Sequence, residues 1–373
     1  MQKPYKVIIS GGGTGGHIYP AIAIANALLE KDSRTELLFV GAEDRMEMQK
    51  VPAAGFKIEG LWISGIQRRL TLDNLMFPVK VVSSVFKAKS ILKRFDADIA
   101  IGVGGYASFP LLFAANMSGI PTLIQEQNSY AGVTNKFLAK KAKRICVAYP
   151  DMGKFFPVDK IQVTGNPVRK DILEVASKRD EAFKFFGLDS NKKTILSIGG
   201  SLGARTINES LAAGLENFAK QDVQLLWQTG KGYHEKAKAA AEPYSKNVKV
   251  FDFIYMMDMA YALADVVISR AGALSISELC LVKKPTVLVP SPNVAEDHQT
   301  KNAMALVNRE AAGIIKDTEA RQTLVAEALK LLKDTDRQNK YKKNIAALAK
   351  PDAAKEIAET VIQTIEQNRA SKK

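Results

Sequence analysis

The sequence predicts an α/β protein built from two doubly wound, Rossmann-like domains that face each other across a cleft. Short apolar runs alternate with segments of helical spacing along most of the chain, which is typical of parallel sheets. Glycine-rich turns separate a strand from a helix at two distant places, residues 11–16 and residues 199–204. The chain has 373 residues, and because a domain usually contains about 100–200 residues, we expect two domains.

The first half begins with a β-branched run at residues 6–10, followed by a helical segment at residues 18–30. Further strands are predicted where apolar runs recur, at residues 35–41, 97–103, 121–126 and 144–149. Residues 99–125 carry no charge and are long enough for a membrane span. Because this stretch contains several glycines and prolines, we expect strand, turn, helix and strand instead.

The strand pattern restarts at residues 193–198 and is followed by one predicted helix over residues 205–220. Strands are then predicted in the runs 224–230, 248–254, 265–272 and 286–292. The repeated order of strand, glycine turn and helix indicates an internal duplication. A Gly-Asn-Pro turn within residues 164–170 predicts domains at residues 1–165 and 166–350. Residues 351–373 are predicted to form a C-terminal helix, with packing against the N-terminal domain as one option.

The composition, 46% hydrophobic and 25% charged, is that of a globular protein and excludes a disordered or fibrous chain. Two cysteines, Cys146 and Cys280, exclude a disulfide framework and suit a reducing compartment. The 53 basic residues exceed the 39 acidic ones, for a net charge of +14. This excess predicts an anionic partner: nucleic acid, a lipid surface or a phosphorylated small molecule.

The first glycine turn matches G-x-G-x-x-G at Gly11, Gly13 and Gly16. Glycine lets the backbone approach a phosphate, and a helix N-terminus offers unpaired N–H groups to it. A dinucleotide enzyme would also need an acid after the second strand, for which Glu43 or Asp44 would serve. No Gly-Lys-Ser/Thr follows, so a Walker A loop is excluded. Two such turns suit one nucleotide donor and a second phosphorylated substrate.

Three polar features near these turns could carry chemistry. His17 follows the first turn directly and could take a proton from a hydroxyl, unless its role is only structural. Asp96 and Asp98 form a D-x-D motif, but they precede a strand, whereas ligands bind beyond the carboxyl ends of strands. We therefore expect no metal there. Glu278, in the first turn of a predicted helix, could accept from ribose hydroxyls or be a solvated acid.

Two basic segments lie in the N-terminal half. Residues 66–94 hold seven basic residues against one acidic residue, and residues 136–144 add five basic residues and no acid. The first segment also carries apolar residues, which is typical of a peripheral helix at an anionic lipid surface. The alternative is a core-facing helix with a solvated basic face. With no aromatic-interleaved basic motif and no helix-turn-helix signature, nucleic acid is not expected.

Seven motifs, in the order in which they occur along the chain, resemble those of the MurG family. Its members are UDP-N-acetylglucosamine:N-acetylmuramyl-(pentapeptide)-pyrophosphoryl-undecaprenol N-acetylglucosamine transferases. The motifs span residues 8–303 and read GGGTGGHIYPAIAIANAL, IGVGGYASFP, QEQNSYAGVTNKFLAKKA, GNPVR, GGSLGARTIN, SRAGALSISE and EDHQTKNA. The resemblance implies a GT-B fold, in which the N-terminal domain binds the acceptor and the C-terminal domain binds the donor.

The resemblance also implies the reaction: inverting, metal-independent transfer of N-acetylglucosamine from UDP-N-acetylglucosamine to the C4 hydroxyl of the muramyl sugar of lipid I. The product is lipid II, an intermediate of peptidoglycan synthesis, and no cofactor is implied. The expected location is peripheral, at the cytoplasmic face of the bacterial inner membrane. The expected partners are the two substrates and an anionic membrane surface, with other cell-wall synthesis proteins as further candidates.

Carried over by motif, His17 and Glu126 are rival candidates for the general base. The family's donor contacts correspond here to Thr14, Gly15, Gly16, Asn128, Arg169, Ser201, Ile254, Arg270, Ala273, Leu274, Ser275, Ile276, Ser277, Glu278 and Gln299. The expected acceptor and membrane contacts are Tyr106, Leu75, Phe77, Arg68, Arg69 and Lys80. Leu202 and Ala271 replace the Gln and Ser of many relatives, so side-chain hydrogen bonds are not expected there.

Two other enzymes of the same fold remain as alternatives. One is a transferase that glucosylates diacylglycerol, against which the acceptor-type motifs IGVGGYASFP and QEQNSYAGVTNK argue. The other is a nucleotide-sugar epimerase, which needs no lipid. Turnover with lipid I or diglyceride, and product analysis without acceptor, separate the three enzymes.

Overall fold

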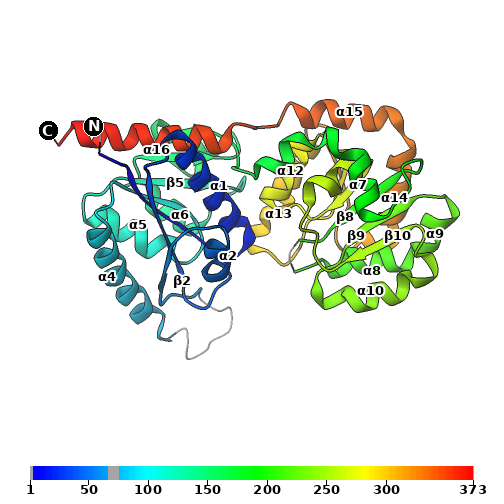
Figure 1. Cartoon of the computed structure of the whole chain (residues 1–373), viewed down its shortest axis with the longest axis horizontal. Coiled ribbons are helices and arrows are strands. Elements are labelled where there is room, and N and C mark those ends of the chain that lie inside the picture. Colours follow the sequence, from blue (N-terminus) through cyan, green and yellow to red (C-terminus); the bar gives the residue numbers. More distant parts are fainter. Residues whose placement is uncertain (1–2, 66–74, 201, 373) are drawn as a thin grey trace. The chain divides into compact units, whose positions relative to one another are not determined.

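A computed structural model of the chain describes residues 3–65, 75–200 and 202–372. It divides into two compact units (Figure 1). The first contains Met1–Arg169 and Asp352–Lys373, and the second contains Lys170–Pro351. The C-terminal helix thus belongs to the same unit as the N-terminal sheet. No helix in the described part of the chain has both the length and the apolar character needed to cross a membrane.

The first unit is built on a parallel seven-stranded sheet with the order β3-β2-β1-β4-β5-β6-β7. Its strands are β1 (Lys6–Gly11), β2 (Glu36–Ala42), β3 (Ile58–Leu61), β4 (Ile99–Gly104), β5 (Thr122–Glu126), β6 (Arg144–Val147) and β7 (Ile161–Val163). From β1 the chain first adds strands on one side, and β4 then starts the other side against β1. The point where the order reverses is where open α/β sheets bind their ligands.

Helices cover both faces of this sheet. They are α1 (Gly15–Lys31), α2 (Glu47–Ala53), α4 (Phe77–Phe95), α5 (Ser108–Met117), α6 (Val133–Ala139) and α16 (Ala353–Ala370), with the short 3-10 helices η1 (Met152–Lys154) and η2 (Val158–Lys160). Side chains alternate along β1, so Ile8 joins the core under α4, α5 and α6, whereas Val7 and Ile9 join the core under α1 and α16. The uncharged residues 99–125 form β4, α5 and β5, which confirms the predicted strand, helix and strand.

The C-terminal helix α16 packs along α1, and Figure 1 shows the two side by side. Its side chains Ile357, Val361 and Ile365 are fully buried, as their helical spacing predicts. Arg369, near the end of α16, contacts Asp98 at 2.7 Å, just before β4 begins. These contacts explain why a segment at the far end of the sequence groups with the first unit.

The second unit repeats the design with a parallel six-stranded sheet of order β10-β9-β8-β11-β12-β13. Its strands are β8 (Thr194–Ile198), β9 (Gln224–Gln228), β10 (Val248–Phe251), β11 (Val266–Ser269), β12 (Thr286–Leu288) and β13 (Gly313–Ile314). Its α-helices are α7 (Arg179–Phe186), α8 (Arg205–Ala213), α9 (Leu215–Lys220), α10 (His234–Ala241), α11 (Met257–Leu263), α12 (Ala273–Val282), α13 (His298–Val307), α14 (Ala320–Lys333) and α15 (Thr335–Ala346). The short 3-10 helices are η3 (Lys170–Glu174), η4 (Ala176–Lys178), η5 (Lys231–Tyr233), η6 (Glu242–Tyr244) and η7 (Ala295–Asp297).

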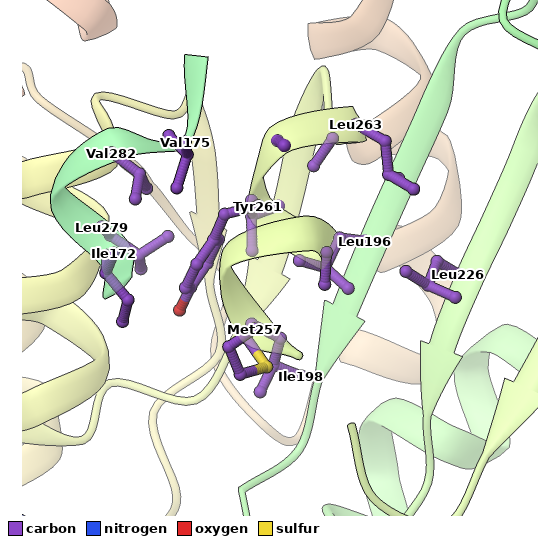
Figure 2. Close-up of a cluster of buried hydrophobic side chains, with 14 of the residues drawn as sticks. Ile172, Val175, Leu196, Ile198, Leu226, Met257, Tyr261, Leu263, Leu279 and Val282 are labelled. Carbon is purple, nitrogen blue, oxygen red and sulfur yellow. The ribbon is translucent and has the colours of Figure 1, made fainter. Parts of the chain in front are cut away.

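The core of this unit lies on both faces of its sheet. Figure 2 shows one face, where Leu196 and Ile198 of β8 meet Tyr261 of α11 and Leu279 of α12. On the other face Ile195 of β8 packs with side chains of α8 and α14. Apolar side chains on both faces of β8 are what a buried parallel strand requires.

The single helix predicted over residues 205–220 is wrong, because it divides at Gly214 into α8 and α9. A Cβ atom at Gly214 would lie 2.6 Å from a methyl carbon of Val325 in α14. Glycine at this position therefore permits the close approach of α14 to α8. The predicted strand over residues 248–254 is also shorter, since β10 ends at Phe251.

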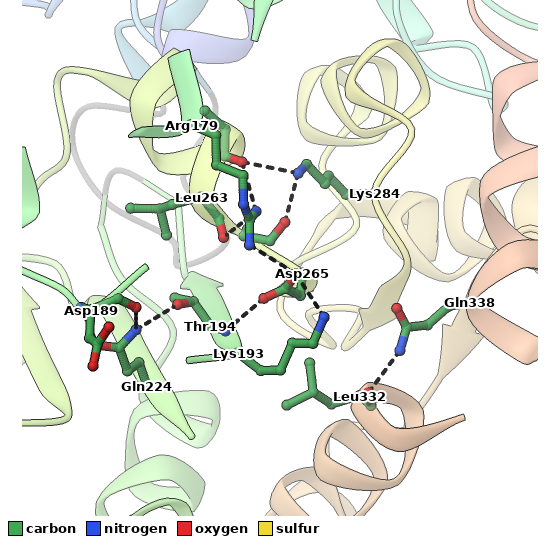
Figure 3. Close-up of polar contacts among 12 residues, drawn as sticks. Arg179, Asp189, Lys193, Thr194, Gln224, Leu263, Asp265, Lys284, Leu332 and Gln338 are labelled. Atoms are coloured by element: carbon green, nitrogen blue, oxygen red, sulfur yellow. Dashed lines mark hydrogen bonds and ion pairs between the residues drawn. The ribbon is translucent and has the colours of Figure 1, made fainter. Parts of the chain in front are cut away.

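A polar cluster lies where β8 and β11 begin, at the edge of the sheet opposite the glycine turn (Figure 3). The Asp265 carboxylate accepts from the Thr194 N–H at 2.8 Å and from Arg179 at 3.2 Å. Beside it, Lys284 Nζ donates to the Ala264 carbonyl oxygen at 2.7 Å. Burial, and then the charge of Arg179, lower the pKa of Lys284 from 10.5 to about 8.

Replacing Lys284 with Met is expected to change how stability depends on alkaline pH. Between pH 8 and pH 10.5 the unfolded chain binds a proton at Lys284 that the folded chain does not, so stability rises with pH across this window. Relative to Lys284→Met, the natural chain should gain up to about 3 kcal/mol of unfolding free energy across it. Urea denaturation at several pH values measures this difference. A difference that is constant with pH, as expected for the exposed control Lys283→Met, would contradict it.

Candidate active site

The loops after β1 and β4 meet at the point where the strand order of the first unit reverses. The Gly12 N–H donates to the Gly104 carbonyl oxygen at 3.2 Å. A Cβ atom at Gly105 would lie 2.4 Å from the Gly12 carbonyl oxygen, and Gly105 has a φ of +92°. Only glycine fits there, for both reasons. Because ligands bind at such a reversal, this loop pair is the candidate site of the first unit.

His17 lies in the first turn of α1, within this loop pair. Its Nδ1 is 2.9 Å from the Gly12 carbonyl oxygen. A carbonyl oxygen only accepts, so Nδ1 carries the hydrogen, and in the neutral ring the lone pair is on Nε2. The ring lies against Gly104, where a Cβ atom would be 2.7 Å from Nε2. The site therefore holds an imidazole in the tautomer that can accept a proton at Nε2.

Glu47, the first residue of α2, is a residue that sequence reasoning missed. Its carboxylate is 1% exposed and accepts from the Gly13 N–H at 2.8 Å and the Ala42 N–H at 3.0 Å. Of the acids considered from the sequence, Glu43 pairs with Lys87 at 2.9 Å. The sequence signal that could have indicated Glu47 is an acidic residue at the start of a helix soon after the second strand. Because Glu47 accepts from Gly13, this N–H of the loop is already bound within the unit.

The remaining residues of the first turn lie at the surface. Thr14 and Gly16 are exposed, and the Tyr19 ring lies against Gly15, 3.1 Å from the position of a Cβ atom there. The Arg169 guanidinium lies 5.9 Å from the centre of the Tyr19 ring. Arg169 is thereby brought to the first turn of α1, although it is far away in the sequence.

Glu126 ends β5 and is 2% exposed. One carboxylate oxygen accepts from the Asn128 N–H at 3.1 Å and the Asn128 side chain at 3.3 Å. The other accepts from the Gly132 N–H at 3.0 Å and from Asn135 Nδ2 at 2.8 Å. These bonds hold the loop between β5 and α6 in shape. Glu126 thus positions Asn128.

Tyr106 is 47% exposed and lies beside Gly13.

In the second unit the glycine turn after β8 packs closely on the end of β9. A Cβ atom at Gly203 would lie 2.1 Å from the Thr229 carbonyl oxygen, and the φ of Gly203 is +79°. Gln228 Nε2 donates to the Gly200 carbonyl oxygen at 3.1 Å. Ser201 lies outside the described residues, while Leu202 is 89% exposed. The strand order reverses between β8 and β11, so this turn corresponds to the one after β1.

Helix α12 begins after β11 at the same reversal point, with Gly272 as its N-cap. Ala273, Leu274 and Ser275 are partly exposed in its first turn. The side chain of Ile276 is buried in the core, and the Ser277 hydroxyl donates to the Ala273 carbonyl oxygen at 3.0 Å. Ile276 therefore points into the fold, whereas Ser277 is partly exposed.

Four more predicted donor contacts of the second unit have partners within it. The Glu278 carboxylate accepts from the Tyr261 hydroxyl at 3.0 Å, and Gln299 Oε1 accepts from the Ser291 N–H at 2.9 Å. Ile254 is 2% exposed, and its N–H donates to Gln228 Oε1 at 3.4 Å. The Arg270 guanidinium donates to the Val289 carbonyl oxygen at 3.0 Å and pairs with Asp317. Arg270 therefore ties the ends of β11 and β12 to the segment after β13.

The D-x-D acids lie at the amino end of β4, as expected. Asp96 pairs with Lys3 at 2.8 Å, and Asp98 accepts from the Lys6 N–H at 2.9 Å. Within residues 3–65, 75–200 and 202–372, no three or more His, Cys, Asp or Glu side chains are placed to hold a metal ion. Both cysteines are buried, and burial raises the pKa of each to about 12, which leaves them as unreactive thiols.

Two of the residues predicted to contact the acceptor or the membrane, Lys80 and Phe77, pack on the inner side of α4. Lys80 is only 8% exposed, and its Nζ lies 3.3 Å from Ser64 Oγ and 5.6 Å from the centre of the Trp62 ring. Phe77 is half-buried and packs against the core. Both residues lie on the inner side of the helix. Leu75 is 75% exposed, and Arg68 and Arg69 lie outside the described residues.

Two doubly wound units, each with a glycine turn at its strand-order reversal, are the architecture of the GT-B class of glycosyltransferases. Family models agree: residues 7–147 match the glycosyltransferase family 28 N-terminal domain, and residues 194–357 match its C-terminal domain. The chain belongs to the MurG family within these glycosyltransferases.

Relatives and solved structures support this membership. Proteins from Cytophaga hutchinsonii and Parabacteroides distasonis, both named UDP-N-acetylglucosamine--N-acetylmuramyl-(pentapeptide) pyrophosphoryl-undecaprenol N-acetylglucosamine transferase, are 61% and 56% identical to this chain. The alignments cover 99% of both chains in the first case, and 98% of this chain and 100% of the relative in the second. The crystal structure of MurG from Acinetobacter baumannii is 30% identical, with a TM-score of 0.76 over 96% of this chain and 100% of that one.

An epimerase shares only the fold. The structure of UDP-GlcNAc 2-epimerase from Neisseria meningitidis is 17% identical, with a TM-score of 0.67 over 96% of this chain and 100% of that one. Identity at this level shows a common architecture and says nothing of a common reaction.

Proposed function

We propose that this chain transfers N-acetylglucosamine from UDP-N-acetylglucosamine to the C4 hydroxyl of the muramyl sugar of lipid I, forming lipid II. The observation that carries the proposal is the pair of near full-length relatives that bear this transferase name. The His17 geometry supports it, because the reaction needs a group that removes a proton from a sugar hydroxyl. The first unit would bind the acceptor, and the second would bind the donor.

In the proposed reaction His17 is the general base. The acceptor oxygen attacks the anomeric carbon from the face opposite UDP, its proton moves to His17 Nε2, and the electron pair of the breaking C–O bond leaves with the UDP phosphate. This displacement inverts the configuration at the anomeric carbon. The four donors around the Glu126 carboxylate support a positioning role for that residue instead.

Charge develops on the UDP β-phosphate as the sugar bond breaks. The exposed first turn of α12 supports a donor site here, because a helix N-terminus presents N–H groups and a positive dipole to an anion. Arg169, held over Tyr19, is the proposed cationic contact. The N–H groups of the α12 turn would stabilise the leaving group without a metal ion.

The test is transfer of labelled sugar from UDP-N-acetylglucosamine to lipid I, with and without a chelator. The proposal expects labelled lipid II at equal rates in both reactions. Loss of activity with chelator would overturn the metal-independent mechanism. Labelling of diacylglycerol, or epimerised UDP-sugar without acceptor, would overturn the transfer to lipid I.

We further propose that the first unit binds an anionic membrane surface through the outer face of α4, the α4 stripe. It consists of Val79, Val82 and Phe86 of α4 together with Leu75 just before the helix, spaced three or four residues apart and 51–75% exposed. Helix α6 adds the exposed side chains Val133 and Phe137, and the centre of the Phe137 ring lies 5.6 Å from that of Phe109 in α5. Basic residues lie along α4 (Lys87, Lys89 and Lys93), in α6 (Lys136) and directly after it (Lys140). Exposed apolar side chains beside lysines favour an anionic lipid surface.

The substitution Phe86→Glu is expected to weaken binding to vesicles of anionic lipid by about tenfold, because it places a charge in the α4 stripe. Co-sedimentation with vesicles measures this binding. The matched control is Val158→Glu, which charges an equally exposed apolar residue in η2 and should leave binding unchanged. Equal losses in both variants, or equal binding to neutral and anionic vesicles, would contradict the proposed surface.

Because its acceptor is a membrane lipid, the proposed location is the cytoplasmic face of the bacterial inner membrane. There the basic residues would meet anionic head groups. Other cell-wall synthesis proteins are candidate partners at the same surface, whereas nucleic acid is not.

A further inference from the structure

A carboxylate, one peptide group and the His17 imidazole form a continuous hydrogen-bonded chain in the first unit. Glu47 Oε2 accepts from the Gly13 N–H at 2.8 Å, and His17 Nδ1 donates to the Gly12 carbonyl oxygen at 2.9 Å. The Gly12 carbonyl and the Gly13 N–H belong to the same planar peptide unit. The two ends of that peptide therefore connect Glu47 to His17.

The fold leaves little freedom at this connection. A Cβ atom at Gly12 would lie 2.1 Å from Glu47 Oε1, and one at Gly41 would lie 2.6 Å from Glu47 Cγ. Both positions need glycine because the Glu47 side chain fills the space. The Ala42 N–H holds the second carboxylate oxygen, and the Gly12 N–H is held by β4. Hydrogen bonds to Glu47 on one side and to the end of β4 on the other thus fix the Gly12–Gly13 peptide.

We propose that Glu47 is a positioning residue that acts on His17 through the Gly12–Gly13 peptide. It holds the imidazole with its hydrogen on Nδ1 and stabilises the imidazolium formed when Nε2 takes the acceptor proton. A carboxylate that accepts from one end of a peptide group polarises it, which makes the carbonyl at the other end a stronger acceptor. The carboxylate would orient the imidazole as in a carboxylate–histidine pair, but with an amide group between the two partners. The inference rests on the proposed role of His17 as the base.

Other titratable side chains also lie near the same loop. The Tyr106 ring, in the loop after β4, approaches Gly13. The Arg169 guanidinium lies over the ring of Tyr19 in α1. In the described contacts of the loop, Glu47 is the anion hydrogen-bonded to the peptide that His17 contacts.

The test compares the natural chain with Glu47→Gln by nitrogen-detected NMR of the histidine rings. The chain has three histidines, so the His17 signals can be assigned with His17→Gln. Glu47→Gln should lower the pKa of His17 by about half a unit or more, because a neutral amide no longer favours the imidazolium. Turnover at its pH plateau should fall by about tenfold, with KM for UDP-N-acetylglucosamine within about twofold. An unchanged pKa of His17 would overturn the inference.

A matched control and a second measurement separate this role from a structural one. Glu43→Gln removes a carboxylate from the same segment, where it pairs with Lys87 and not with the loop, and should leave the pKa of His17 unchanged. In the natural chain the Gly13 amide proton should shift as His17 titrates, since His17 Nδ1 contacts the Gly12 carbonyl of the same peptide unit. A Gly13 signal that ignores the titration would overturn the inference even where Glu47→Gln does not fold.

The failure of the proposed function has a different signature. If the acidic limb of the turnover profile persists in His17→Gln, His17 is not the base, and the proposed mechanism is wrong. If the limb belongs to His17 but does not move in Glu47→Gln, the mechanism stands and the role of Glu47 is wrong.

Discussion

His17→Ala is expected to lower turnover by about 10²–10⁴-fold, the usual contribution of a general base, while the affinity for UDP stays within about twofold. The reason is that the His17 imidazole holds its hydrogen on Nδ1 against Gly12 and thus accepts a proton at Nε2. Single-turnover transfer to lipid I measures the chemical step, and calorimetric titration with UDP measures the affinity.

His234→Ala, which removes a histidine from α10 in the second unit, is the control and should leave both quantities unchanged. The acidic limb of the natural turnover profile should also disappear in His17→Ala. Turnover within a few-fold of the natural chain would show that another group takes the proton.

Glu126→Gln is expected to destabilise the first unit by about 2–4 kcal/mol and to raise KM for the donor. An amide can replace only one carboxylate oxygen as an acceptor, so two of the four donors around Glu126 lose their partner, at about 1–3 kcal/mol each. The loop that carries Asn128 then loses its shape. Thermal and urea unfolding measure the stability, and steady-state kinetics measure KM.

Asn135→Ala is the matched variant, because it removes one of the same four donors and keeps the carboxylate. It should show the same changes in smaller measure, about 1 kcal/mol of stability. If Glu126→Gln kept its stability and its KM but lost turnover and one limb of the pH profile, Glu126 would be the base and His17 would not.

The fold could be predicted from local patterns because strands and helices of parallel sheets differ strongly in sequence period. The runs that end at Ser10, Val103 and Ile198 all became strands in the order expected. The division of the helix at Gly214 could not be predicted, because its cause is Val325, more than a hundred residues away. A lone glycine in a helical pattern is also often tolerated.

The surface of α4 shows the limit of composition as a guide. Basic and apolar residues were both visible in the sequence, but which side of the helix each occupies depends on how α4 turns toward the sheet. The structure turns Lys80 and Phe77 inward and Leu75 and Phe86 outward. A lysine on the inner face is tolerated here because its ammonium lies beside Ser64 and the Trp62 ring.

By itself, the sequence determined the class of this protein. The periodicity of its apolar residues, its two glycine turns and the order of its motifs sufficed, because each depends on neighbours along the chain. The tertiary structure alone decided which groups act on one another. Glu47 meets the His17 loop only because β2 and β4 lie on either side of β1 in the sheet, and Glu126 is surrounded by donors only because its loop folds back on it. Hydrogen bonds require atoms within about 3 Å, and only the packed fold determines that proximity.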